Sequence, residues 1–252
     1  MYKKSATYCI ATVIMGAFSL LLRWLQCSAI FSDKTDLAVS GAFVRYLMAA
    51  VLVLVPLAFW RLSRMVGMNE GSREPEEALV SPHFAVSALL GVAALVAALG
   101  AVLLFFQSVS MQMKLVALLG LLAAPVVMLY PMLPGWGGIG AAFSLLPVAY
   151  YALWMVMIYK ENVVNPVLWG FAVLILAVAA GLYALFQLSA YLFYSAKPRK
   201  ALFACGLATV YGMTALADSV VLSVKILLGG WCVALGAISW ILLANIPREE
   251  SK

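Results

Sequence analysis

Long apolar runs separated by short polar segments repeat along the whole chain of 252 residues. Each run has about the 20 apolar residues that a helix needs to cross a hydrocarbon core of roughly 30 Å. The runs predict eight membrane-spanning helices and hence an all-α, polytopic integral membrane protein, with residues 1–252 forming one transmembrane domain. The predicted spans are approximately 8–31, 41–60, 83–107, 113–132, 139–159, 166–194, 201–217 and 225–246.

Polar and helix-breaking residues mark the connections between these runs. The longest connection, about 61–82, contains two glycines and two prolines and is predicted to be a solvated loop. Asp36 or Ser40 is expected to cap the second helix, because their side chains can accept from the free backbone N–H groups of its first turn. Pro166 is expected to begin the sixth helix, since proline is favourable in a first turn.

Two patterns inside the apolar runs concern helix packing. Alanines one turn apart in the third helix, Ala93, Ala97 and Ala101, predict a face on which a neighbouring helix packs closely. Pro125 and Pro147 lie inside the fourth and fifth helices, where each removes a backbone donor. Broken helices can build binding sites in transporters. We favour the alternative of packing kinks, in which neighbouring groups satisfy the freed carbonyls.

The composition agrees with a membrane protein. Apolar residues make up 66% of the chain and charged residues only 10%, against about 25% charged in soluble domains. The net charge of +6 comes from basic residues scattered at span ends, which is typical of topology signals and not of nucleic-acid binding. The first run continues past Arg23 without an obvious cleavage site, so we expect a retained helix and not a signal peptide.

The basic residues also predict an orientation in the cell membrane. An intracellular N-terminus places ten of them on the cytoplasmic side and six on the outer side, so both termini are expected in the cytoplasm. The ten are Lys3, Lys4, Arg61, Arg64, Arg73, Lys197, Arg199, Lys200, Arg248 and Lys252, and the six are Arg23, Lys34, Arg45, Lys114, Lys160 and Lys225.

Residues for the common membrane chemistries are absent from the predicted spans. The single histidine, His83, lies at a loop–helix junction, no glutamate lies within a span, and Asp218 is the one aspartate that could. The four cysteines have no CxxC spacing, and neither an HExxH motif nor a Walker A loop occurs. We therefore expect no metal site and no cofactor, and the sequence argues against a hydrolase or an ATP-driven motor.

The candidate ligand-binding residues gather near the predicted outer side. Arg23 and Gln26 are three residues apart and share a helix face, and Arg45 lies in the first turns of the second helix. Either the arginines reach the interface or pair with an aspartate (Asp33, Asp36 or Asp218), which is the interpretation that we favour, or they bind an anionic small molecule or lipid head group. Gln187 and Asp218 complete the candidate set.

These observations favour a transport-related protein, either a small-solute permease or the membrane subunit of a transporter, with a possible anion-recognising outer mouth. The alternative is a non-enzymatic scaffold or assembly partner whose small-residue faces bind another transmembrane protein. An enzyme acting on lipid is a third class, weakened by the lack of acid and base residues. The lipid bilayer is the partner that all three hypotheses share.

Overall fold

The computed structural model describes residues 2–30, 43–66, 75–81, 83–163, 168–194 and 197–245, and all regular structure in these ranges is helical. The all-helical prediction is therefore confirmed. The elements are α1 (Tyr2–Ile30), α2 (Phe43–Met65), α3 (Pro75–Ala78), α4 (Phe84–Gln107), α5 (Met111–Leu129), the 3₁₀ turn η1 (Leu133–Trp136), α6 (Gly137–Asn162), α7 (Leu168–Leu192), α8 (Pro198–Ala215) and α9 (Leu222–Asn245).

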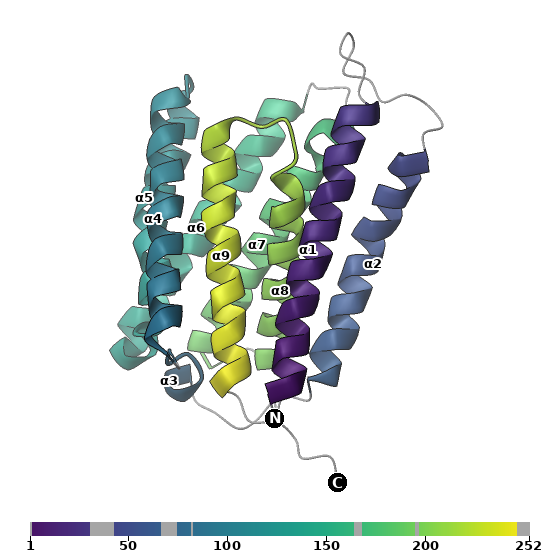
Figure 1. The fold of residues 1–252 in the computed structure, drawn as a ribbon. Coiled ribbons are helices and arrows are strands. Elements are labelled where there is room, and N and C mark those ends of the chain that lie inside the picture. The colour runs from purple at the N-terminus through teal and green to yellow at the C-terminus, as the bar shows by residue number, and fades with distance from the viewer. Residues whose placement is uncertain are drawn as a thin grey trace.

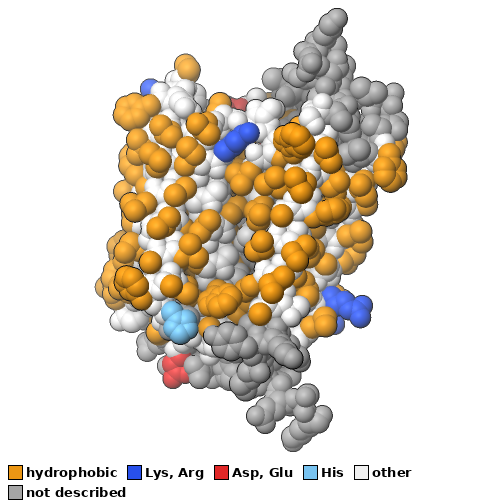
Figure 2. Space-filling view, in the orientation of Figure 1, with side chains coloured by type: hydrophobic (Ala, Val, Ile, Leu, Met, Phe, Trp, Pro, Cys, Tyr) orange, Lys and Arg blue, Asp and Glu red, His pale blue; other side chains and the backbone are white. Residues whose placement is uncertain are grey.

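The eight long helices form an up-and-down bundle (Figure 1). Helix α1 begins and α9 ends at one end of the bundle, called here the terminal end; the opposite end is the distal end. Among the described residues, seven of these helices are long and apolar enough to cross a membrane, and hydrophobic side chains cover the face in Figure 2. A membrane-embedded, multi-pass chain is thus confirmed. The exception is α8, whose first turn carries Arg199 and Lys200.

Helices α4 to α9 form a ring, to which α1 and α2 are added. Each helix from α4 to α8 packs against the next, and α9 packs back against α4. Helices α1 and α2 contact each other and lie against α8 (Figure 1). The molecule therefore has a six-helix ring and a two-helix unit that meets the ring mainly at α8.

The ring closes where α4 meets α9 at backbone contact distance. A Cβ atom built on Gly230 of α9 would lie 2.6 Å from the backbone nitrogen of Ala97, and one built on Gly100 would lie 2.5 Å from that of Leu227. Ala93, Ala97 and Ala101 are buried in this interface region. The predicted small-residue face of the third helix is therefore occupied by a helix of the same chain.

Side chains of the ring satisfy backbone groups near prolines. Pro56 lies inside α2 and cannot donate to the carbonyl of Leu52. The hydroxyl of Tyr211 on α8 donates to that carbonyl over 2.6 Å. Near Pro147, the hydroxyl of Ser189 on α7 donates to the carbonyl of Ser144 over 2.8 Å. At Pro56 a neighbouring helix therefore supplies the donor that proline lacks, as membrane helices allow.

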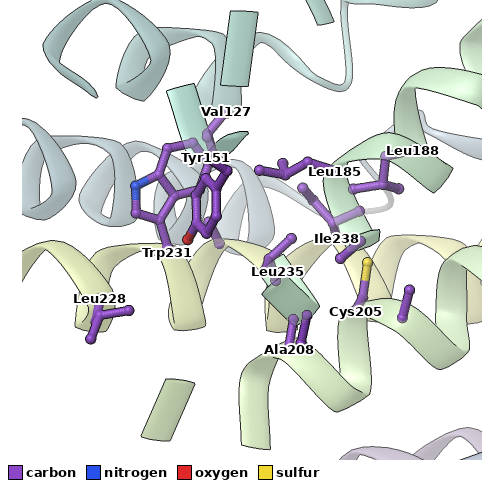
Figure 3. Packing of buried hydrophobic residues seen from close by; sticks show 14 of the residues in the cluster. Val127, Tyr151, Leu185, Leu188, Cys205, Ala208, Leu228, Trp231, Leu235 and Ile238 are labelled. Carbon is purple, nitrogen blue, oxygen red and sulfur yellow. The ribbon is translucent and has the colours of Figure 1, made fainter. Parts of the chain in front are cut away.

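An aromatic cluster fills the centre of the ring. It consists of Tyr150, Tyr151 and Trp154 of α6 and Trp231 of α9, all at most 2% exposed. The Tyr150 ring is stacked between the two indoles, with centroid separations of 5.6 Å to Trp154 and 5.9 Å to Trp231. Figure 3 shows Tyr151 against Trp231, where the rings meet edge to face at 5.1 Å. Packed rings, not open space, occupy the middle of the bundle.

Several helices extend beyond the predicted spans, and for α2 and α6 the extension changes the place of a charged residue. Helix α2 continues to Met65, so Arg61 and Arg64 lie in its last turns and not in the predicted loop; the Arg64 guanidinium lies 4.0 Å from the Trp60 ring centroid. Helix α6 continues to Asn162 and therefore includes Glu161, contrary to the expectation that no glutamate lies within a span. Polar ends are tolerated because long side chains reach the interface.

Other sequence predictions fall outside the described residues. These are the capping of the second helix by Asp36 or Ser40, the start of the sixth helix at Pro166 and residues 67–74 and 82 of the connection 61–82.

Candidate functional site

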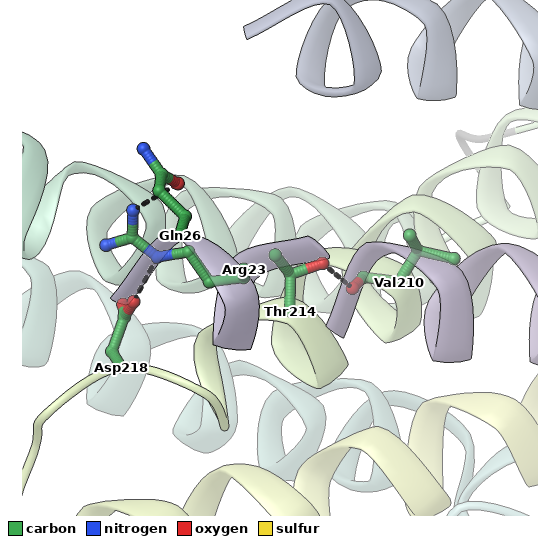
Figure 4. Close-up of polar contacts among 5 residues, drawn as sticks. All are labelled: Arg23, Gln26, Val210, Thr214 and Asp218. Carbon is green, nitrogen blue, oxygen red and sulfur yellow. Dashed lines mark hydrogen bonds and ion pairs between the residues drawn. The ribbon is translucent and has the colours of Figure 1, made fainter. Parts of the chain in front are cut away.

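A buried ion pair joins the two-helix unit to the ring near the distal end. Nε of Arg23 on α1 donates to Oδ1 of Asp218, in the turn between α8 and α9, over 2.5 Å. Nη1 of Arg23 donates to Oε1 of Gln26 over 2.8 Å. Figure 4 shows the guanidinium between these two side chains. Arg23 and Gln26 are each 1% exposed and Asp218 is 0% exposed. The structure thus shows pairing with an aspartate, the first of the two alternatives for Arg23.

Local backbone structure places these groups. The three-residue spacing of Arg23 and Gln26 puts both on one face of α1. Helix α8 ends at Ala215, and the N–H of Asp218 donates to the Ala215 carbonyl over 3.1 Å, which keeps the turn tight. The Thr214 hydroxyl, one turn earlier, donates to the Val210 carbonyl of its own helix and does not compete for the carboxylate.

The carboxylate of Asp218 is only partly satisfied. Within the described part of the chain, its Oδ2 atom has no hydrogen-bond partner, and neither has the buried hydroxyl of Ser19, one turn before Arg23. Burial raises the pKa of Asp218 to about 6, although the charges of Arg23 and Lys225 and the hydrogen bond from Arg23 lower it. The pKa rises because the charged carboxylate loses its water on burial and one of its oxygens gains no hydrogen bond in return.

This pKa predicts a pH dependence of stability. An unfolded aspartate titrates near about 3.9, so between that value and about 6 the folded state binds the proton more tightly. Protonation of Asp218 therefore stabilises the folded protein. This stabilisation is complete below the pKa that Asp218 has in the unfolded chain, and it is lost as the pH rises through the pKa of about 6 that it has in the folded protein. We expect the melting temperature of the detergent-solubilised protein to rise as the pH falls from 7 to 5, and Asp218→Asn to flatten this slope. An equal slope in the variant would contradict the assignment.

The structure brings three of the five candidate residues together. Arg23, Gln26 and Asp218 form one cluster near the distal end. Gln187 is buried near the end of α7, which lies at the terminal end of the bundle, so it belongs to no common site with Arg23. Arg45 lies in the first turn of α2, but its side chain is outside the described part of the structure.

A partly polar pocket of about 490 Å³ opens at the distal end beside this ion pair. The α8–α9 turn supplies Ser219, Val220 and Val221 to the pocket directly after Asp218. Glu161 is the charged residue of the lining, and Trp154 of the aromatic cluster also contributes to the wall. The remaining polar lining residues are Gln107, Ser108, Ser110 and Asn162. The pocket and the ion pair therefore share one short backbone segment.

Sequence reasoning did not identify this pocket. Its lining comes from the α4–α5 connection, the end of α6, α7 and the α8–α9 turn, and each polar residue taken singly is an ordinary helix-end residue. Lys225, which lowers the pKa of Asp218, was interpreted only as a topology signal. The one indication of this pocket in the sequence is Lys225, a charged residue seven positions after Asp218.

No group of three or more His, Cys, Asp or Glu side chains that could hold a metal ion occurs among the residues that the structure describes. The fold and the buried pair define a multi-pass helical membrane protein. In comparisons with protein families, curated proteins and solved structures, nothing matches the chain.

Proposed function

We propose that the chain is a transport-related membrane protein, and that the distal pocket is the entrance for a small solute. The observation that carries this proposal is the position of the pocket above the aromatic cluster: Trp154 belongs to both. Two buried polar atoms in the cluster, the Tyr150 hydroxyl and the Trp231 indole nitrogen, have no hydrogen-bond partner among the described residues. Such atoms are rare in folded proteins, and in a membrane interior they favour a path for solute or water.

Eight spans with both termini in the cytoplasm are part of this proposal. Although α8 is the least apolar of the long helices, it runs between the two ends of the bundle and 13 of its 18 residues are buried by neighbouring helices. Arg61, Arg64, Lys197, Arg199 and Lys200 lie at the terminal end, which supports a cytoplasmic location for that end. The distal pocket then opens to the outside.

The charge in the pocket lining itself favours a neutral or cationic solute. Glu161 contributes the negative charge of the lining. The planar fork of Arg23, which would recognise an anion, is engaged by Asp218 and Gln26. The initial hypothesis of an anion-recognising mouth at Arg23 would therefore require the buried ion pair to open.

In this proposal the ion pair stabilises the closed state of the pocket until a solute binds. Asp218 precedes the turn residues Ser219 to Val221 that line the pocket, so a solute that displaces the turn also displaces the carboxylate from Arg23. Because Arg23 belongs to the two-helix unit and Asp218 to the ring, opening the pair would remove one of the polar contacts that hold the two units together. Rocking of one helix unit against another is a common mechanism of alternating access.

A flux measurement tests the proposal. Proteoliposomes are loaded with labelled alanine, glycerol, choline and sodium, and their release is compared with that from protein-free liposomes. We expect faster release of at least one solute, and a loss of about tenfold, equivalent to 1.4 kcal/mol, in Ser219→Trp, because an exposed pocket residue becomes bulky without disturbing the core.

The matched control is Ser81→Trp, since Ser81 lies between α3 and α4 at the terminal end, away from the pocket. Release equal to that of protein-free liposomes for every solute, or equal flux in the Ser219→Trp variant and the wild type, would reject the distal pocket as an entrance.

A further inference from the structure

An apolar groove runs along α9 on the outer surface of the bundle, between α1 and α4. Figure 2 shows this face, where pale backbone atoms form a hollow between two hydrophobic flanks. The groove has a cavity volume of about 580 Å³. Val13 and Leu89 lie on its flanks, and Gly229, Cys232 and Gly236 lie on its floor. Gly229 and Gly236 are two turns apart, and a Cβ atom added to either would meet no atom within 4 Å.

The hydroxyl groups of the groove are already satisfied. Thr12 donates to the carbonyl of Tyr8 over 2.9 Å, Thr209 to that of Cys205 over 2.8 Å and Ser239 to that of Leu235 over 2.9 Å. Each of these bonds stays within one helix. The groove therefore has no free hydroxyl donor for an occupant, and helix partners in membranes commonly use such groups to associate. The lining favours a purely apolar occupant.

The dimensions of the groove fit a lipid chain. The floor extends from Gly229 to Trp240, which is about 16 Å at 1.5 Å per residue. An acyl chain about 4 Å across, the contact distance of two carbon atoms, needs about 200 Å³ over that length. The cavity volume of about 580 Å³ therefore has room for one or two such chains.

A cation lies at the distal end of the groove. Lys225 is one turn before Gly229 and eleven residues before Gly236, which places all three on the same face of α9. Its side chain is partly exposed, and it forms no ion pair with any residue in the described ranges. At the other end of the floor, Trp240 is 36% exposed, so an aromatic ring closes the groove. A positive charge above an apolar channel is complementary to an anionic amphiphile.

We propose that the groove on α9 binds an acyl chain of an anionic membrane lipid, and that Lys225 binds its head group. This site is separate from the distal pocket, and the proposal does not depend on transport. A bound lipid in this position would bridge α1 and α4, which flank the groove and join the two-helix unit to the ring through one ligand.

Lipid titration followed by native mass spectrometry tests the site. The purified protein is titrated with phosphatidylglycerol and, separately, with phosphatidylcholine in detergent. The double substitution Gly229→Leu/Gly236→Leu fills the groove, and we expect it to weaken the one saturable lipid site by at least about tenfold. Gly91→Leu is the control, because Gly91 on α4 also has open space around it and does not line the groove.

The head group is tested by Lys225→Gln. We expect this variant to lose about fivefold of the preference for phosphatidylglycerol over phosphatidylcholine, the factor for one basic residue beside an anionic lipid, and to keep its affinity for phosphatidylcholine. Equal lipid affinity in the groove-filled variant and in Gly91→Leu would overturn the proposal. The proposal would also be overturned if the wild-type protein binds a second copy or another protein and only the groove-filled variant loses that partner. That result would indicate that a helix occupies this face. Thermal melting of each variant checks that the fold is intact.

Discussion

The substitution Arg23→Gln is expected to lower the free energy of unfolding at pH 7 by about 3 kcal/mol, the lower end of the usual cost of removing one partner of a buried ion pair. Asp218, which is 0% exposed, would then lose the positive charge that lowers its pKa and would have to take up a proton. Asp218→Asn should cost less, because asparagine matches aspartate in size and resembles the protonated carboxyl that the folded state already favours below pH 6. Unfolding of the purified protein by titrated denaturing detergent, at constant lipid content, measures both costs.

A double-mutant cycle separates the pair from its surroundings. The cost of Arg23→Gln should shrink below pH 6, because the isolated carboxyl of Asp218 then takes up a proton. The double substitution should recover part of the loss, since it leaves no buried charge. Additive effects of the two single substitutions would contradict a direct interaction across 2.5 Å.

Gly230→Ala is expected to have the second large effect on stability. The added methyl group would lie 2.6 Å from the backbone nitrogen of Ala97 and 2.9 Å from the carbonyl oxygen of Ala93. Backbone atoms of a packed helix cannot give way as a side chain can, so α4 and α9 must separate. We expect a loss of about 3 kcal/mol, the upper part of the range for overpacking, measured by the same detergent titration.

The neighbouring substitution Gly229→Ala is the control. It makes the same chemical change one residue earlier on α9, where a Cβ atom meets nothing within 4 Å. Stability should be unchanged or improved by up to about 1 kcal/mol, the helix propensity gained from glycine to alanine. If both variants lose stability equally, the loss comes from a change within α9 itself and not from steric overlap between α9 and α4.

The sequence predicted the helices but not their neighbours. Apolar runs and breakers locate the long helices to within a few residues, because crossing a membrane demands a minimum apolar length. The alanine row on α4 predicted a close contact, yet a row of small residues specifies only that a backbone can approach, not which one. The partner, α9 at Gly230, follows from packing across more than a hundred residues of chain.

The candidate site was predictable in part for a similar reason. An arginine inside an apolar run predicts a partner, and Asp218 was one of three aspartates that could supply it. Asp33 and Asp36 are closer in the sequence. The choice of Asp218 depends on α1 lying against α8, which positions Arg23 beside a residue 195 positions later.

Helix α8 has a consequence for how the protein is made. Its first turn carries Arg199 and Lys200, and it is the one long helix of the described chain that lacks the apolar character of an independent membrane span. Its neighbours in the bundle include α1, α2 and α7, all synthesised earlier, and α9, synthesised later. In the eight-span arrangement that we propose, lipid alone is therefore a poor solvent for α8 during insertion. The earlier helices would have to be in the bilayer to receive it, and α9 would have to follow before the ring is closed.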